Sequence, residues 1–113
     1  MTKQEQKQIN QLVLDKLEQF TNSSLKGLSV RRLRDCNAFV YEYLDDKTGA
    51  VLYALQSYNT IIAIIDGNTV YDFLRLVYGY TATSAKHIAK FTHDYIDSWY
   101  DETIVYRYYP IEG

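Results

Sequence analysis

The stretch SYNTIIAIID, Ser57–Asp66, decides the fold of this 113-residue chain. Its core, Ile61–Ile65, is an unbroken apolar run with polar turn residues on both sides. β-Branched side chains favour the pleated conformation, and a run this short is typical of a strand. A strand without polar alternation needs cover on both of its faces. We therefore expect residues 60–65 to form a central strand, with the other elements arranged to cover it.

Further strand patterns on either side of this run predict an antiparallel meander. Asp45–Gly49 begins with aspartate and ends with glycine, which is typical of a turn between two strands. Tyr58–Thr60 predicts a tighter link into the isoleucine strand, and Asp66–Asn68 predicts the turn after it. Val70–Tyr78 fits either a strand or a helix, with a strand favoured over Thr69–Phe73. The expected strands are 37–44, 50–58, 60–65, 69–74 and 102–109.

Two helices complete the expected fold, which is of class α+β. The first is amphipathic, and its apolar stripe could pack on the sheet or on a second copy of the chain, as a homodimer. The second, at residues 81–95, has a candidate N-terminal cap in Thr83 or Thr81. We expect an antiparallel β-meander of four to five strands packed with this later helix. The expected limits are a single domain over 1–113, the N-terminal helix at 3–21 and the sheet-and-helix core at 28–110.

The composition favours an intracellular, soluble protein. Apolar residues make up 47% of the chain and charged residues 23%, as in ordinary folded domains, while 12 tyrosines are an excess typical of contact surfaces. The net charge of −2 argues against coating nucleic acid and predicts weak or no binding to it when free. Cys36 is the single cysteine, which fits a reducing compartment, and no apolar run reaches membrane-spanning length.

Two sets of residues are candidates for contacts, and each has a structural alternative. Tyrosines and acidic residues could form a docking face, or they could be half-exposed sheet positions and a solvated connector. The candidate partner-binding residues are Tyr41, Tyr43, Tyr53, Asp94, Asp97, Asp101 and Glu102. Basic residues could contact an anion or nucleic acid, but a solvated edge strand explains most of them and is favoured. These are Lys26, Arg31, Arg32, Arg34, Lys86 and Lys90.

The start of the later helix has two interpretations. Backbone N–H groups together with Thr83, Ser84 and Lys86 could hold an anion there. Alternatively His87 is neutral, packs against the sheet and bonds to the Ser57–Thr60 link, which is the favoured interpretation. Spacing does not place His87 and His93 on one metal, and no catalytic order of residues is evident, so we expect neither metal nor cofactor nor enzymatic activity.

A family resemblance adds to these inferences. SYNTIIAIID together with YTATSAKHIAKF, Tyr80–Phe91, resembles a pattern in small proteins of bacteriophages and mobile elements. The residues that carry the resemblance are Ser57, Tyr58, Thr60, Thr83, His87 and Phe91. Thr81 and Ala85 depart from the pattern, and the match covers about a third of the chain.

The resemblance implies a function that the residues alone do not. Small acidic phage proteins of this kind include inhibitors of host defence, among them anti-CRISPR proteins. The implied function is a non-enzymatic inhibitor in the cytoplasm of an infected or prophage-bearing bacterial host, which binds a CRISPR effector nuclease or its guide complex. The alternative is a phage accessory protein that binds nucleic acid through the basic residues.

Overall fold

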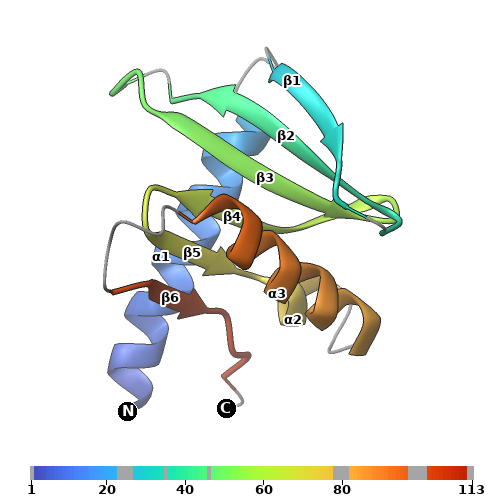
Figure 1. Ribbon diagram of the computed structural model, residues 1–113. Coiled ribbons are helices and arrows are strands. Elements are labelled where there is room, and N and C mark those ends of the chain that lie inside the picture. The colour runs from blue at the N-terminus through green and yellow to red at the C-terminus, as the bar shows by residue number, and fades with distance from the viewer. Residues whose placement is uncertain are drawn as a thin grey trace.

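The structure is a computed structural model that describes residues 2–22, 27–34, 36–45, 47–77, 82–96 and 102–111. It confirms the α+β class, with helices packed on a largely antiparallel sheet (Figure 1). The elements in chain order are α1 (Lys3–Asn22), β1 (Gly27–Arg32), β2 (Ala38–Leu44), β3 (Val51–Ser57), β4 (Thr60–Asp66), β5 (Thr69–Asp72), α2 (Leu74–Val77), α3 (Ala82–Tyr95) and β6 (Ile104–Arg107).

The sheet has six strands in the order β1-β2-β3-β4-β5-β6, so the expected four to five strands were too few. The first five form the antiparallel meander, and β1, which carries Arg31 and Arg32, is its edge strand. Arg31 and Arg32 therefore lie on an edge strand, as expected for them, while Arg34 follows its end. β6 joins β5 in parallel, because α2 and α3 carry the chain back across the sheet before it starts.

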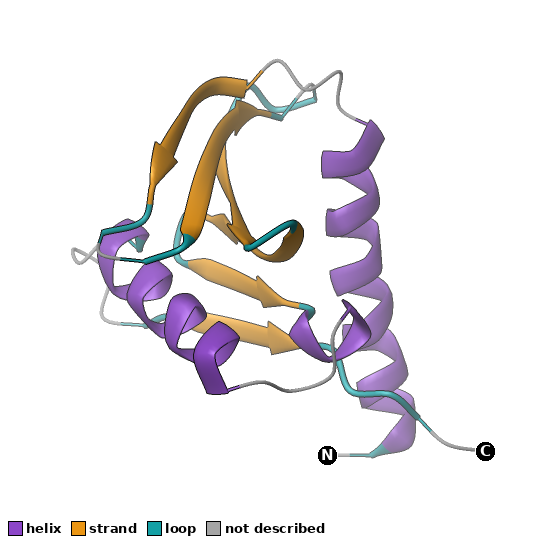
Figure 2. Cartoon of the chain, turned by 90° about the vertical axis from the view of Figure 1, so that its right-hand side faces the viewer, coloured by secondary structure: helices purple, strands orange, loops and turns teal. Residues whose placement is uncertain are grey.

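The central strand β4 is covered on both faces, as its sequence predicts. α1 lies on one side of the sheet and α3 on the other (Figure 2). Ile62, Ala63, Ile64 and Ile65 are all fully buried. A register shift beside Leu55 places Ile62 and Ala63 together in the cluster under α3, while Ile64 lies in the cluster under α1.

The apolar stripe of α1 packs on the sheet, which is the first of its two expected alternatives. Val13 is fully buried, and Phe20 meets Tyr43 edge to face with the ring centroids 4.9 Å apart. The same helix also closes the far edge of the sheet. Its Asn10 donates to the Tyr109 carbonyl at 2.8 Å and accepts from the Tyr109 N–H at 3.0 Å. The Asn10 amide thus makes, with the backbone that follows β6, the two hydrogen bonds that a neighbouring strand would otherwise make.

The segment 70–78 contains both of the structures between which its sequence is ambiguous. β5 ends at Asp72 rather than at residue 74, because the Asp72 carboxylate accepts from the Leu74 N–H at 3.0 Å and starts the short helix α2. The last strand is also shorter than the expected 102–109. Within the described residues, no helix has the length and apolar character needed to span a membrane.

The turns follow their residue types closely. Gly49 and Gly67 both have positive φ angles, of 71° and 62°, which explains a glycine at each position. Tyr58 also has a positive φ, of 55°, in the tight link between β3 and β4. The capping assignment of Thr83 is wrong: α3 begins at Ala82, so Thr83 lies inside its first turn, and the alternative, Thr81, lies outside the described residues.

Candidate functional site: the groove between α3 and β6

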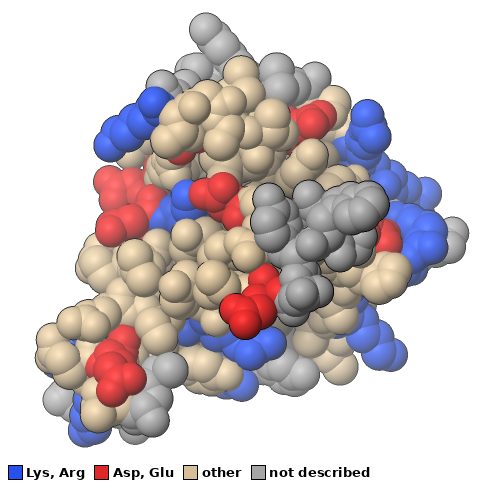
Figure 3. Space-filling model, turned by 60° about the vertical axis from the view of Figure 1, so that its left-hand side comes forward, with Lys and Arg blue, Asp and Glu red and all other residues tan. Residues whose placement is uncertain are grey.

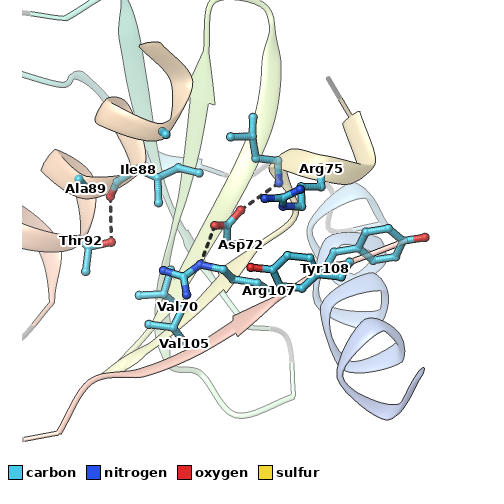
Figure 4. A pocket seen from close by; sticks show the side chains of 12 residues that line it. Val70, Asp72, Arg75, Ile88, Ala89, Thr92, Val105, Arg107 and Tyr108 are labelled. Atoms are coloured by element: carbon cyan, nitrogen blue, oxygen red, sulfur yellow. Dashed lines mark hydrogen bonds and ion pairs between the residues drawn. The ribbon is translucent and has the colours of Figure 1, made fainter. Parts of the chain in front are cut away.

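A groove of about 350 Å³ lies between α3 and the β5–β6 end of the sheet (Figure 4). We call it the α3–β6 groove. Its volume is that of a site for a small ligand or for one or two side chains of a partner. It is lined by Val70, Asp72, Leu74, Arg75, Ala85, Ile88, Ala89, Thr92, Val105, Arg107, Tyr108 and Tyr109.

The floor of the α3–β6 groove is apolar and its wall is partly exposed. Val70 and Leu74 are buried beneath it, and α3 contributes Ile88. On the β6 side, Val105 is 38% exposed and Tyr109 40% exposed. Large apolar side chains that remain exposed beside a hollow are typical of a surface that docks another molecule.

Charged groups stand at the rim of the α3–β6 groove. Arg107 Nε lies 3.5 Å from Asp72 Oδ2, a long separation for an ion pair, and the Arg107 side chain is 56% exposed. The Arg75 guanidinium lies over the Tyr109 ring, 4.7 Å from its centroid. Figure 4 shows Asp72 between the two arginines. An apolar floor beside two guanidinium groups suits a ligand that places an apolar side chain next to a carboxylate.

The structure does not bring the candidate partner-binding residues together. Tyr43 is 2% exposed and belongs to the core, so its assignment as a surface contact is wrong; its side chain faces α1, where Phe20 covers it. Tyr41 and Tyr53 are half-buried on opposite faces of the sheet, and the Tyr41 hydroxyl donates to Gln56 Oε1 at 2.8 Å.

The acidic candidates are dispersed as well. Asp94 Oδ1 pairs with Arg34 Nη2 at 3.2 Å, and Glu102 is exposed, its carbonyl accepting from Asn68. Asp97 and Asp101 lie outside the described residues. Figure 3 shows acidic side chains spread among uncharged ones, which does not define an acidic docking face on that side.

The basic candidates, in contrast, come together from two elements. Arg32 Nε donates to the Cys36 carbonyl at 2.9 Å, and Lys90 Nζ donates to the Arg34 carbonyl at 2.8 Å. Lysines and arginines gather along one edge in Figure 3. Arg31 is exposed on β1 and Lys86 on α3, whereas Lys26 lies outside the described residues.

Ser57 and His87, two of the residues that carry the family resemblance, form with Ser84 a buried polar cluster between α3 and the β3–β4 hairpin, which we call the polar lock. Ser57 Oγ lies 2.8 Å from His87 Nδ1 and 3.3 Å from Ser84 Oγ. Tyr58 stacks at an angle beside His87 with the ring centroids 5.9 Å apart, and Phe91 is fully buried one turn further along α3. The interpretation of His87 as packed and bonded to the link is confirmed. Thr60 pairs with Ser57, and Thr83 is exposed.

The polar lock is enclosed by the fold. Ser57 is fully buried and His87 is 6% exposed. Among the described residues, no three histidine, cysteine or acidic side chains gather to hold a metal. The Ser57–His87 contact joins α3 to the end of β3.

His87 should make stability fall at mildly acidic pH. Burial, and then the charge of Lys90, lower the pKa of His87 below its ordinary value of 6.5. Because the unfolded chain binds the proton more readily than the native one, the free energy of unfolding is highest above pH 6.5 and declines as the pH falls from there toward the native pKa. We expect denaturant titrations at pH 7.5 and 5.5 to show this loss.

Replacement of each histidine in turn tests whether His87 causes this loss, with His93 as the control. His87→Gln should reduce the difference between the two pH values, whereas His93→Gln, at an exposed position, should leave it unchanged. Equal pH dependence in the wild type and His87→Gln would contradict this role of the lock.

Sequence reasoning missed the α3–β6 groove. Arg75 and Arg107 lie in different segments of the chain, and neither is among the basic residues that the sequence pattern indicates as candidates. The one available signal was the apolar pair Ile104 and Val105, in a strand that ends in a polar tail. Both are exposed in the structure.

Together these observations define a small α+β protein with a groove between α3 and the β5–β6 end of its sheet. The chain belongs to the family of unknown function DUF8033, whose model matches residues 4–105. The match runs from the start of α1 to the first residues of β6, so it covers strands β1 to β5 and α3. No curated protein and no solved structure matches the chain.

Proposed function

We propose that this chain is a non-enzymatic binding protein that docks a protein partner in the α3–β6 groove. The observation that carries the proposal is the exposed apolar wall of Val105 and Tyr109 beside a hollow with two arginines at its rim. The complementary partner segment is extended or looped and carries an apolar side chain next to an aspartate or glutamate. Burying such a segment removes apolar surface from water and pairs its carboxylate with a guanidinium.

The resemblance to phage proteins supplies the class of partner to test. Small inhibitors of host defence act by occupying a site that an effector needs, which requires a docking surface and no chemistry of their own. We propose a CRISPR effector nuclease or its guide complex as the partner, in the cytoplasm of an infected or prophage-bearing bacterium. The net charge of −2 supports a protein partner over free nucleic acid.

Nucleic-acid binding is the second candidate function, and one observation favours it. Arg32 on β1 and Lys90 on α3 both bond to the 34–36 segment, which carries Arg34, so basic residues from separate parts of the chain lie near one another despite the negative net charge. Asp94 offsets part of this charge through its pair with Arg34. Arginine forks at such a surface suit phosphate oxygens.

Purified effector complexes and free nucleic acid separate the two candidates. We expect the wild type to bind an effector complex and to show little affinity for free DNA or RNA at physiological salt. Reversal of Arg31, Arg32 and Arg34 to glutamate should then have little effect on effector binding. Tight binding to free nucleic acid that weakens steeply with salt and collapses on the reversals, with no binding to any effector, would overturn the first proposal and support the second.

A further inference from the structure

The two edges of the sheet are treated differently by the fold. At the β6 edge, side chains of α1 bond to the backbone: Gln6 Nε2 donates to the Arg107 carbonyl at 3.1 Å, and Asn10 bonds to both backbone groups of Tyr109. At the opposite edge, no further strand among the described residues pairs with the outer side of β1 (Figure 1). An open strand edge presents backbone donors and acceptors to which another chain can add a strand.

The register shows which backbone groups of β1 face this open edge. The Leu33 N–H donates to the Ala38 carbonyl at 2.8 Å, directly after the last paired residue of β1. In an antiparallel pair, residues whose N–H and C=O groups bond across the ladder alternate with residues whose groups point away from it. Leu33 and Arg31 therefore bond to β2, whereas Val30 and Arg32 direct their N–H and C=O groups outward. Two donors and two acceptors at this spacing suit one added strand.

The side chains along the open edge are cationic and apolar. Arg31 and Arg32 are both exposed, and as neighbours on a strand they lie on opposite faces of the sheet. Val30, on the Arg32 face, is 55% exposed and lies opposite Tyr41 of β2. Phe39 lies on the same face opposite Arg32 and is 38% exposed. One face of the edge therefore offers apolar surface beside a guanidinium group, and the other face offers a second guanidinium group.

Charge selects the kind of strand that this edge accepts. A second copy of the chain would bring Arg31 and Arg32 of both molecules into one short seam, where like charges repel. An acidic strand instead places carboxylates beside the same guanidinium groups, which bind carboxylates in two-point contact. Glu42 of β2 lies on the Arg31 face and accepts from the Ser29 hydroxyl at 2.9 Å, so it offsets part of the positive charge on that face alone.

We propose that the open edge of β1 binds an extended acidic peptide segment by antiparallel strand addition. The segment carries aspartate or glutamate opposite Arg32 and Arg31 and an apolar, β-branched residue opposite Val30, in that order along its chain. Its backbone bonds to the outward groups of Val30 and Arg32, and its side chains supply the selectivity. The site lies at the other edge of the sheet from the α3–β6 groove and does not rest on the function proposed for that groove.

Titration of the full chain with the blocked peptide Thr-Glu-Glu-Ile-Thr-Val, at low salt and followed by NMR, tests the proposal. We expect saturable shifts of the Val30 and Arg32 amide signals. Methylation of the isoleucine nitrogen removes the N–H that faces Val30 and should abolish binding, whereas methylation of the second glutamate nitrogen, which points away from β1, should leave binding as it is. No saturable shift with the parent peptide, or equal binding of the two methylated peptides, would overturn strand addition.

Two variants of the protein test the charge and the edge separately. Arg31→Glu combined with Arg32→Glu should weaken binding of the acidic peptide at least about tenfold and favour its lysine counterpart, Thr-Lys-Lys-Ile-Thr-Val. Val30→Pro removes an N–H that β2 does not use, so it should abolish peptide binding and leave the thermal midpoint near that of the wild type. Unchanged acidic-peptide binding after the charge reversal, or a large fall in the midpoint of Val30→Pro, would contradict the proposed site.

Two other occupants of the edge are distinguished by the same measurements. A wild-type dimer that Val30→Pro dissociates would identify a second copy of the chain as the occupant. A single-stranded oligonucleotide that shifts the Val30 and Arg32 signals, while the acidic peptide does not, would identify nucleic acid. Either result would overturn the acidic peptide as the partner.

Discussion

Ile62→Ala and Ile64→Ala are each expected to lower the free energy of unfolding by roughly 2–5 kcal/mol. Both side chains are fully buried, and they face opposite helices: Ile62 lies in the cluster under α3 and Ile64 in the cluster under α1. Trimming either one removes apolar contacts and leaves a cavity that the surrounding strands cannot close. Chemical denaturation of the two variants beside the wild type measures the loss.

Ile104→Ala is the matched control for these substitutions. The residue type and the change are the same, but Ile104 lies on the outer strand and is 41% exposed. The expected loss is below about 1 kcal/mol. Near-zero losses for both Ile62→Ala and Ile64→Ala would show that β4 is not the centre of the core.

Asn10→Ala is expected to lower the free energy of unfolding by roughly 2–3 kcal/mol. Asn10 is 9% exposed and makes two hydrogen bonds to the backbone of Tyr109, 99 residues away in the chain. Alanine removes both bonds and leaves a backbone donor and acceptor at the edge of the sheet without their partner. The Tyr109 amide should also exchange with solvent faster, which hydrogen exchange measures residue by residue.

Gln11→Ala provides the comparison for Asn10→Ala. Gln11 is the next residue of α1, is exposed, and among the described residues its side chain bonds to Asp15 of the same helix. Its replacement should change stability by less than about 0.5 kcal/mol and leave exchange at Tyr109 as it is. If the two variants behave alike, α1 does not close the sheet edge through Asn10.

Local patterns were enough to predict the centre of this fold. The isoleucine run specified β4, and Gly49 and Gly67 specified turns because each adopts a positive φ that other side chains resist. The favoured role of His87 could also be predicted, because a buried histidine and a buried serine each require a hydrogen-bond partner. His87 and Ser57 provide that partner for one another.

Longer-range relations could not be read from the sequence. The apolar stripe of α1 shows that the helix packs against another surface but does not show which surface that is. The hydrogen bonds of Asn10 to Tyr109 join residues near the two ends of the sequence, which no local pattern relates. The parallel pairing of β6 depends on how α3 returns the chain. The residues that line the α3–β6 groove come from three separate segments, so no single sequence pattern predicts the groove.

The most direct test of the proposed function is a DNA-cleavage assay with a purified CRISPR effector nuclease and three forms of this protein. Ala89 is exposed and lines the α3–β6 groove, so Ala89→Phe should fill the hollow, whereas Thr83→Phe adds an aromatic ring to α3 outside it. We expect the wild type and Thr83→Phe to inhibit cleavage alike, and Ala89→Phe to inhibit at least about tenfold more weakly, a loss of about 1.4 kcal/mol in binding. Equal inhibition by all three forms, or none by the wild type, would contradict the account.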